Sequence, residues 1–368
     1  MGRTLTLRPE TLRLDSVSNE TSNAGNRPCT SSRLPHALLI RNPSLGSAIA
    51  VKLYKRRVSE EDTMPSQTEI RQQVTQQIVA ALERNLLPWR RPWRATATCA
   101  GQPGRHTNVA SRKAYQGVNP LLLELHAMQH GLTSRWWGTF PMWKSLGCSI
   151  KKRPPNVEEG CWGCRVVFWK PLTRTVVTDD EEEEERRFVL RTFTVFNADQ
   201  VEGAEPFQVH EDKGESPAEP DFRPAEELIS ATGADIRYGG ETAFYDPTAD
   251  YIRLPHRARF GSLGAYYETA LHELAHWSEP RQHLDRRRLG YAMCELVAEM
   301  AACFVASEIG VPQGESLENH VSYLKSWLGA LKNDRTFIFQ AAKQASKTCD
   351  FLLSFVRKPE PEAMGAMS

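Results

Sequence analysis

The spacing of apolar positions predicts ordered elements from about Gln67 onward. Apolar residues recur at helical spacing over 67–82, and the pattern stops before Pro88, through which a helix does not readily continue. The segment NPLLLELHAM predicts a second helix with Pro120 in its first turn. The runs CRVVFWK and RFVLRTFTVF are rich in β-branched and aromatic residues, so they predict two antiparallel strands joined by the acidic loop DDEEEEE.

Residues 203–222 are rich in proline, glycine and charge, which predicts a boundary between two domains. Beyond it, PAEELISATG predicts a helix, TAFYD and DYIRLP predict strands, and helical periodicity continues to about Val356. The predicted fold class is therefore α+β, with an N-terminal α+β domain followed by a helix-rich domain.

The 368 residues are enough for two domains, each with its own core. We predict an N-terminal domain at 65–205, a linker at 206–222 and a C-terminal domain at 223–357. The segments 1–64 and 358–368 are expected to be disordered; the first shows no sustained period of 2 or 3.6. An upstream start of translation would explain the N-terminal extension, and mass spectrometry of the native N-terminus tests that hypothesis.

Composition is that of a soluble globular protein, with 40% hydrophobic and 25% charged residues. No apolar run approaches the roughly 18 residues that a membrane helix needs, and the N-terminus lacks the layout of a secretory signal, so we expect a cytoplasmic protein. The eight cysteines are scattered along the chain, which favours reduced thiols. Cys161 and Cys164 form a lone Cys-x-x-Cys pair, for which we expect free thiols rather than a structural metal.

Charge is distributed unevenly along the chain, although the formal net charge is only +1. Residues 65–178 hold 16 lysines and arginines against 5 aspartates and glutamates, whereas the rest of the chain holds 30 against 40. The same basic segment contains seven of the nine tryptophans, namely Trp89, Trp93, Trp136, Trp137, Trp143, Trp162 and Trp169. Cations neutralise phosphates and exposed indoles stack on unpaired bases, so the segment is a candidate binder of single-stranded DNA.

We expect this segment to prefer single strands to duplex and to lose affinity as salt rises. About half or more of its tryptophans are expected to be partly buried, since tryptophan usually packs in a core. The candidate DNA contacts are aromatic or cationic: Trp89, Arg90, Arg91, Trp93, Arg94, Arg112, Lys113, Trp136, Trp137, Lys144, Lys151, Lys152 and Arg153.

The stretch YYETALHELAHWSEP contains a His-Glu-x-x-His pattern at helical spacing. His272 and His276 are four residues apart, so on a helix their imidazoles leave one face and can share a metal ion. Glu273 lies beside the first histidine, where a carboxylate can accept a proton from a water molecule on the metal. Catalytic zinc needs a third protein ligand and leaves a fourth position for water.

A second helical segment, CELVAEMAACFVASE, supplies two carboxylates at i and i+4, Glu295 and Glu299. We assign Glu295 as the third ligand and Glu299 as a carboxylate that orients a ligating imidazole, although the spacing also allows the exchanged assignment. A metzincin would need a histidine six residues after His276, but Gln282 occupies that position. The sequence thus predicts one zinc ion in a gluzincin-like metallopeptidase site.

These motifs, extended by HLDRRRLG, YGGETAFYDPTADYIRLPHRARF and ENHVSYLKSWLGALKNDRTFIFQAAKQA, resemble the zincin-like metallopeptidase domain of ArdC-type antirestriction proteins. The segments LLPWRRPW, AYQGVNPLLL, RWWGTFPMWKSLG, VVFWKP and FTVFNADQVEG resemble the ArdC-like single-stranded-DNA-binding domain, which is shared with TraC-type conjugative primases. The resemblance covers about Gln67 to Val356. It implies a protein that protects incoming plasmid or phage DNA from host restriction.

The resemblance adds three candidate DNA contacts, Asn108, Tyr115 and Asn119, although an asparagine beside a turn also commonly caps backbone. The chain departs from the family at Cys294, where the family often has a second glutamate, and in its longer acidic tract. Three functions stay open: a DNA-binding antirestriction factor, a DNA-localised zinc protease acting on a protein, and a non-catalytic scaffold stabilised by zinc. Tyr251 and Tyr266 are candidates for oxyanion stabilisation.

Overall fold

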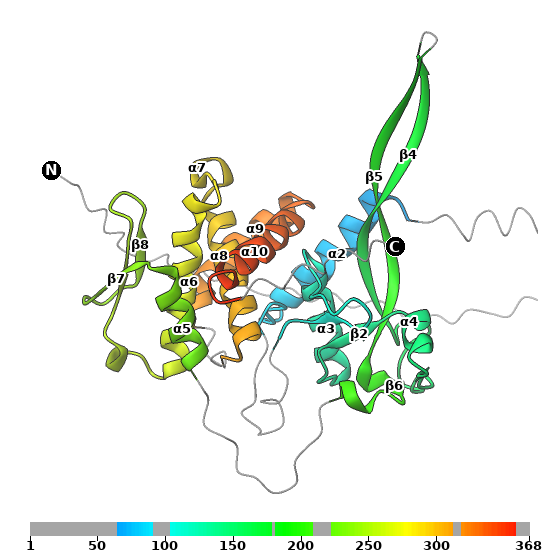
Figure 1. The fold of residues 1–368 in the computed structure, drawn as a ribbon, viewed down its shortest axis with the longest axis horizontal. Coiled ribbons are helices and arrows are strands. Elements are labelled where there is room, and N and C mark those ends of the chain that lie inside the picture. Colours follow the sequence, from blue (N-terminus) through cyan, green and yellow to red (C-terminus); the bar gives the residue numbers. More distant parts are fainter. Residues whose placement is uncertain (1–64, 91–103, 179–180, 209–221, 312–317, 358–368) are drawn as a thin grey trace, which may run out of the picture. The chain divides into compact units, whose positions relative to one another are not determined.

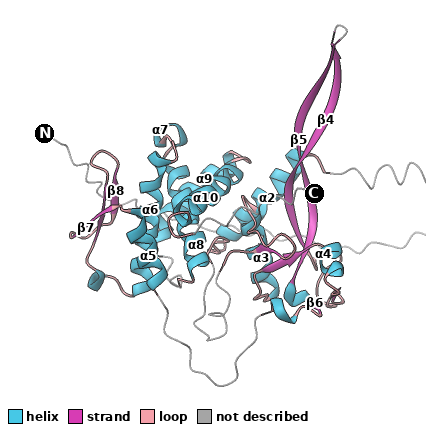
Figure 2. Cartoon of the chain, in the orientation of Figure 1, coloured by secondary structure: helices cyan, strands magenta, loops and turns pink. Residues whose placement is uncertain are grey.

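The structure is a computed structural model, and it describes residues 65–90, 104–178, 181–208, 222–311 and 318–357. By their contacts, the described residues belong to one compact unit, Met64–Ser368. The two segments predicted to be disordered lie outside the described residues. Figures 1 and 2 show the arrangement of helices and strands.

The two helices predicted in the first half are present. Helix α2, Gln67–Leu82, begins at a capping box: the Ser66 hydroxyl accepts from the Glu69 N–H, and the Glu69 carboxylate accepts from the Ser66 N–H at 2.7 Å. Helix α3, Asn119–His130, has Pro120 in its first turn and ends at Gly131, whose φ of 63° favours glycine. Both helices bury the apolar faces that their periodicity predicted.

Helix α3 packs against a four-stranded sheet in the order β1-β2-β5-β4. Strands β1, Thr107–Asn108, and β2, Trp136–Gly138, are parallel, whereas β5, Glu181–Asn197, is antiparallel to both β2 and β4, Cys164–Thr178. Strands β4 and β5 pair along their whole length and form a long two-stranded ribbon (Figure 2).

The prediction that the acidic tract forms a loop was wrong for most of its length. Residues 181–185 belong to β5, and the pairing continues to Thr178 opposite Glu181. The β-branched residues of the facing strand favour extended backbone, and the ladder hydrogen bonds join backbone groups whatever charge the side chains bear. A run of glutamates therefore does not end the ribbon.

Several short elements were not predicted from the sequence. They are β3 (Ser149–Ile150), β6 (Val201–Glu202), α4 (Phe140–Ser145) and the 3-10 turns η1 (Ala198–Gln200) and η2 (Glu205–Phe207). They enclose a small separate core around Trp143, whose indole N–H donates to the Phe196 carbonyl at 3.0 Å.

The C-terminal part is helix-rich, as predicted. Helix α5 (Arg223–Thr232) precedes a sheet in the order β7-β9-β8, formed by Asp235–Tyr238, Tyr251–Leu254 and Phe244–Asp246. The remaining helices are α6 (Leu263–Arg281), α7 (Arg286–Leu289), α8 (Tyr291–Ile309), α9 (Glu318–Asn333), α10 (Phe337–Leu353) and the 3-10 turn η3 (Arg257–Arg259). Helices α6 and α8 lie side by side and both contact α10 (Figure 1).

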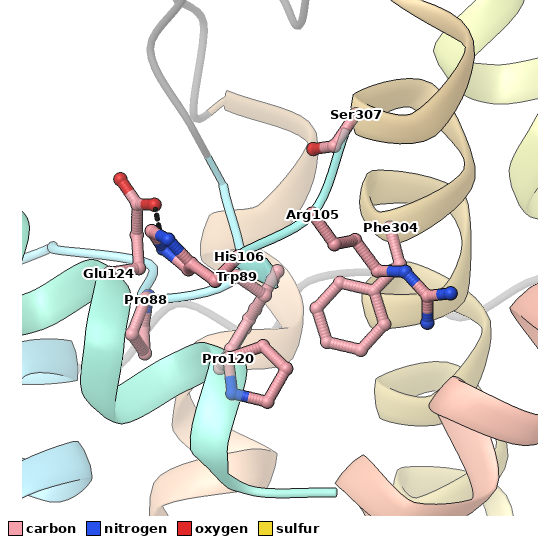
Figure 3. A pocket seen from close by; sticks show the side chains of 8 residues that line it. All are labelled: Pro88, Trp89, Arg105, His106, Pro120, Glu124, Phe304 and Ser307. Carbon is pink, nitrogen blue, oxygen red and sulfur yellow. Dashed lines mark hydrogen bonds and ion pairs between the residues drawn. The ribbon is translucent and has the colours of Figure 1, made fainter. Parts of the chain in front are cut away.

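One hydrophobic core runs through both predicted domains, from Ile70 to Leu353. Trp89 packs edge-to-face on Trp327 of α9, with ring centroids 5.8 Å apart. Beside this contact, a narrow cavity is lined by residues of both halves, including His106 and Phe304 (Figure 3). The two halves thus share buried apolar surface.

Ion pairs reinforce this shared surface. Arg90 pairs with Glu268 of α6, and the buried Arg105 pairs with Glu308 and Asp350 at 2.7 Å each. Charge-assisted bonds of this kind fix the orientation of the segments that they join.

Two further expectations concern membrane spans and thiols. Among the helices of the described residues, none combines the length and apolar character that a bilayer crossing requires. The six cysteines within the described ranges are all free, including Cys161 and Cys164.

Candidate metal centre

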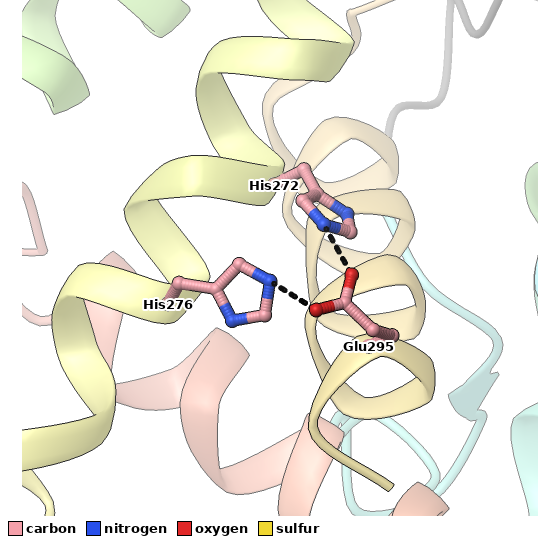
Figure 4. A group of neighbouring side chains, drawn as sticks. All are labelled: His272, His276 and Glu295. Carbon is pink, nitrogen blue, oxygen red and sulfur yellow. Dashed lines mark ion pairs between the residues drawn. The ribbon is translucent and has the colours of Figure 1, made fainter. Parts of the chain in front are cut away.

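Two neighbouring helices present the predicted ligands. The Ser262 hydroxyl caps α6 by accepting from the Ala265 N–H at 3.1 Å, and the helix then runs unbroken through the His-Glu-x-x-His motif. Helix α8 is buried along most of its length and places Glu295 opposite the two histidines (Figure 4). Packing between the two helices therefore brings together residues that are about twenty positions apart.

His272, His276 and Glu295 face one another. The Nε2 atoms of both histidines lie 3.5 Å from the Glu295 carboxylate, one beside each oxygen. One potential ligand atom from each of the three residues lies within 4.8 Å of the others. His276 and Glu295 are buried and His272 is partly exposed, so the cluster is open on one side.

The remaining imidazole nitrogens face carboxylates. His272 Nδ1 lies 3.6 Å from Glu299, the residue assigned to orient an imidazole. His276 Nδ1 makes a 2.7 Å hydrogen bond to Glu279, which the sequence reasoning missed. A carboxylate one helical turn beyond a ligating histidine was the available signal. Such partners fix the ring orientation and the tautomer of a metal-binding histidine.

Arg286, at the start of α7, connects these carboxylates. Its guanidinium lies 3.3 Å from Glu279 and 3.4 Å from Glu295. The sequence reasoning did not select it, because the run RRRL resembles an ordinary solvated segment. The arginine holds both carboxylates from the side of α7.

The electrostatics of the cluster favour positive charge. Burial lowers the pKa of His272, but hydrogen bonds to Glu295 and Glu299 outweigh it and raise the pKa to about 10. Burial likewise raises the pKa of Glu295, but the two histidines hold it well below its usual range. A divalent cation would meet the same favourable field.

Glu273 is a buried carboxyl beside the cluster. Burial raises its pKa, against the opposing effect of His272 and His276. A raised carboxyl pKa brings proton exchange closer to neutral pH, which suits a group that accepts and returns a proton.

Tyr251 and Tyr266, the two candidates for oxyanion stabilisation, contact other side chains of the C-terminal half. The Tyr266 hydroxyl is hydrogen-bonded to Tyr238 at 3.1 Å, and the ring of Tyr251 lies under the Arg237 guanidinium at 4.2 Å. Tyr323 of α9 was missed by the sequence reasoning. Its pKa is raised by burial, by its hydrogen bond to Tyr291 and by the charges of Glu295 and Glu273, which places it in the field of the centre.

This donor set fits a divalent metal ion. Two imidazole nitrogens and one carboxylate oxygen are the protein ligands of many catalytic metal sites, with further positions left for water or substrate. The carboxylates on the outer imidazole nitrogens complete the arrangement that metal-binding histidines usually have.

Comparison with known proteins agrees with the geometry. A profile of the N-terminal domain of anti-restriction factor ArdC matches residues 68–196, and a profile of zincin-like metallopeptidases matches residues 223–344. The metal-free crystal structure of the antirestriction protein ArdC from plasmid R388 is 33% identical, with a TM-score of 0.63 over 78% of this chain and 97% of that one. The chain belongs to the ArdC family of antirestriction proteins.

Other relatives bear on the metal and on the extent of the similarity. ArdC of R388 was also crystallised with Mn(II); that structure is 32% identical, with a TM-score of 0.58 over 79% of this chain and 99% of that one. The uncharacterized protein y4eC of Sinorhizobium fredii is 34% identical over 80% of this chain and 95% of its own length. The DNA primase TraC of Escherichia coli is 30% identical over 82% of this chain, but this chain spans only 21% of that primase.

Several candidate DNA contacts of the ArdC-like half are buried. Trp89 lies in the shared core, Arg90 is ion-paired, and Trp137 donates its indole N–H to His106 at 2.9 Å. Trp143 is also buried. Of the tryptophans of the basic segment that the structure describes, only Trp169 is exposed. This agrees with the expectation that about half or more are at least partly buried.

The three polar residues suggested by the family resemblance bond within the fold. Asn108 Oδ1 accepts from two backbone N–H groups of the following turn, at 3.0 and 2.9 Å. Asn119 exchanges two 2.9 Å hydrogen bonds with the backbone of Val167 in β4. Tyr115 is buried, and burial raises its pKa to about 12. Asn108 and Asn119 thus organise the loop and strand that present neighbouring side chains.

The other candidates differ in exposure. Arg112, Lys113, Lys144, Lys152 and Arg153 are exposed, and Lys151 donates to the Asp199 carbonyl at 2.8 Å. Trp136 is half-buried. The candidates Arg91, Trp93 and Arg94 lie outside the described residues.

Proposed function

We propose that this protein binds the single-stranded DNA of an incoming plasmid or phage in the cytoplasm and protects it from restriction, and that it carries a zinc-dependent metallopeptidase-like centre. The observation that carries the proposal is the meeting of His272, His276 and Glu295 beside buried Glu273, in a chain whose other half matches ArdC. The +11 charge of residues 65–178 supports binding to a polyanion.

The side chains of the centre divide the chemical work. His272, His276 and Glu295 would hold the zinc ion, which when bound polarises a carbonyl and lowers the pKa of water to about 7. Glu273 accepts a proton from the attacking water and returns it to the leaving amine. Glu279 and Glu299 hold the two imidazoles in place from their outer nitrogens.

Two other functions use the same centre. In the first, the DNA-binding half only localises a zinc protease to a protein on DNA. In the second, the metal stabilises the fold and has no catalytic role. Buried Glu273 favours a catalytic centre over the purely structural one, because a structural zinc site has no need of an extra buried carboxyl beside its ligands.

A restriction-protection assay with three variants separates these functions. The wild type is compared with Glu273→Gln, His276→Ala and the DNA-surface variant Lys144→Ala/Lys152→Ala, which removes two exposed lysines of the basic segment. Protection that survives Glu273→Gln but fails in His276→Ala shows that the metal is needed structurally. Loss in Glu273→Gln shows that peptidase chemistry is needed, and loss confined to the DNA-surface variant shows that DNA binding protects by itself.

Metal analysis tests the ligands independently of activity. We expect one zinc per chain, lost in His276→Ala and in Glu295→Ala but retained in Glu273→Gln. Zinc loss in Glu299→Ala together with retention in Glu295→Ala would exchange the roles of these two carboxylates. Absence of any bound divalent metal in the wild type would rule out the mechanism.

A further inference from the structure

A cation-lined cavity lies apart from the metal centre. It has a volume of about 700 Å³, within the range of sites that hold small ligands. Its wall includes five cationic side chains, Arg105, Arg112, Lys113, Arg135 and Arg357, but only two acidic ones, Glu308 and Asp350.

The two acidic residues of the wall, Glu308 and Asp350, already have partners. Arg105 pairs with both at 2.7 Å, and Arg357 lies 3.6 Å from Glu308 and 3.8 Å from Asp350. The cationic side chains of the wall outnumber the acidic ones by three, so the wall has an excess of positive charge. An anion that enters the cavity would meet this excess.

Arg112 is held in place before any ligand arrives. Its backbone is in the left-handed region, with φ of 58°, in a turn that Asn108 caps. Its guanidinium lies 4.8 Å from the centroid of Trp136 and 5.0 Å from that of Phe207. Non-glycine residues seldom adopt this conformation, and such strain tends to occur at functional sites.

Arg135 lies against the same indole. Its guanidinium is also 4.8 Å from the Trp136 centroid. Gly104, with φ of 133°, lies close to the same guanidinium: an added Cβ would lie only 1.8 Å from Arg135 Nη1. A larger residue at position 104 would therefore displace the end of the arginine side chain. A guanidinium group that lies over an aromatic ring keeps its N–H donors in its own plane. There they can form paired bonds to phosphate oxygens.

We infer that Arg112 and Arg135, which both lie over the Trp136 ring, and Lys113 of the same cavity wall bind successive phosphates of single-stranded DNA. The inference rests on the proposed function and gives its DNA-binding half a specific site. Trp136 here orders arginines, whereas the sequence alone suggested that it stacks on a base. Because the arginines are ordered beforehand, less side-chain entropy is lost when the phosphates bind.

Fluorescence anisotropy with the full chain and labelled oligodeoxythymidylate tests the site. The variant Arg112→Ala/Arg135→Ala loses two charge-assisted contacts, so its binding to the oligonucleotide is expected to be roughly 100-fold weaker at low salt. The slope of log affinity against log salt should become shallower by about 1.4, since each phosphate contact on a single strand contributes about 0.7. The matched control, Arg287→Ala/Arg288→Ala, removes two exposed arginines of α7 and should leave both quantities unchanged.

A second probe, deoxythymidine triphosphate, separates a DNA strand from a free nucleotide. If the wild type binds the oligonucleotide and Arg112→Ala/Arg135→Ala binds it with the same affinity, this site is overturned and the proposed function stands. Binding of the triphosphate through these arginines without binding of the oligonucleotide would overturn both the DNA assignment and the proposed function. Failure of the wild type to bind either probe would also overturn both.

Trp136→Leu tests the ordering role without removing a charge. We expect roughly threefold to tenfold weaker binding with an unchanged salt slope, because the variant loses the cation–π contacts that order the two arginines but keeps both charges. Thermal melts of each variant show whether it is folded. A folded Trp136→Leu protein with wild-type affinity would contradict the role assigned to the indole.

Discussion

Glu279 and Arg286 extend the metal centre beyond the residues that face one another across α6 and α8. Glu279 bonds His276 Nδ1, and Arg286 reaches both Glu279 and Glu295. An imidazole whose outer nitrogen is held by a carboxylate keeps its Nε2 lone pair directed at the metal position. The affinity of the site for metal thus depends on residues that are not ligands.

Glu279→Gln is expected to weaken zinc binding about 10- to 100-fold, the usual effect of removing such a partner. Competition with a chromophoric chelator measures this directly and requires no peptidase substrate. The matched control is Glu227→Gln, an exposed residue of α5, which should bind zinc like the wild type. Equal affinity for both variants would show that Glu279 does not position His276.

His126 gives a pH prediction away from the metal centre. Burial and the neighbouring His130, 4.4 Å away by ring centroid, lower the pKa of His126 to about 4, although its bond to the Trp162 carbonyl opposes the shift. The unfolded chain takes up this proton near pH 6.5, before the folded protein does, so stability falls as pH drops from about 6.5 to about 4.

His126→Gln removes this effect. Between pH 7 and pH 5, the loss of unfolding free energy should be about 2 kcal/mol smaller than in the wild type. Urea unfolding at the two pH values measures the difference. His256→Gln, at an exposed position before η3, is the control and should retain the wild-type pH dependence.

The sequence predicted the residues of the centre unevenly. His272 and His276 share a face because helical spacing fixes which side chains of one helix lie together, and packing of α8 against α6 places Glu295 beside them. Glu279 lies one helical turn beyond His276, a spacing that the prediction did not use. Arg286 has no distinguishing spacing, and its importance comes from how α7 folds back toward α8. Arg90 was selected as a phosphate contact on charge alone, and charge does not reveal a partner such as Glu268, 178 residues away.

The ribbon of β4 and β5 continues beyond the last residues that it contributes to the hydrophobic core. Val166 and Leu190 are buried, whereas Leu172 and Phe188 are exposed. Exposed two-stranded pairing adds little stability, because it buries little apolar surface. We therefore expect residues 173–186 to contribute little to the stability of the fold.

Shortening the ribbon tests this. Leu172 and Arg187 are paired, so an Asn-Gly turn can join them in place of residues 173–186. We expect the melting temperature of the shortened protein to stay within about 2–4 °C of the wild type, corresponding to less than 1 kcal/mol. A much larger decrease would show that the distal ribbon contacts the core.

Long elements were predictable and short ones were not. Helices α2, α3, α6 and α8 repeat their apolar period over several turns. Strands β1, β3 and β6 have two residues each, too few for any period, and they exist only because distant segments pair with them. The tract 181–185 was misread because charge was taken to indicate a loop.

At the scale of the molecule, the Trp89–Trp327 contact connects the stability of the two halves. Trp327 is fully buried, and Trp327→Ala is expected to cost about 3–5 kcal/mol. Amide hydrogen exchange should then accelerate in α2 as well as in α9 and α10. Phe140→Ala, whose side chain is 53% exposed, is the control. Unchanged exchange in α2 would support the prediction that residues 65–205 fold as an independent domain.

The shared core also bears on how the gene can be inherited. A recombination event that separated the two halves would leave Trp89, Trp327 and the Arg90–Glu268 pair without their partners. Such products would expose apolar surface and be removed by proteolysis or aggregation. Recombination should therefore preserve the two halves together. The matches to TraC and to y4eC, which each cover about four-fifths of this chain and so include both halves, follow that expectation.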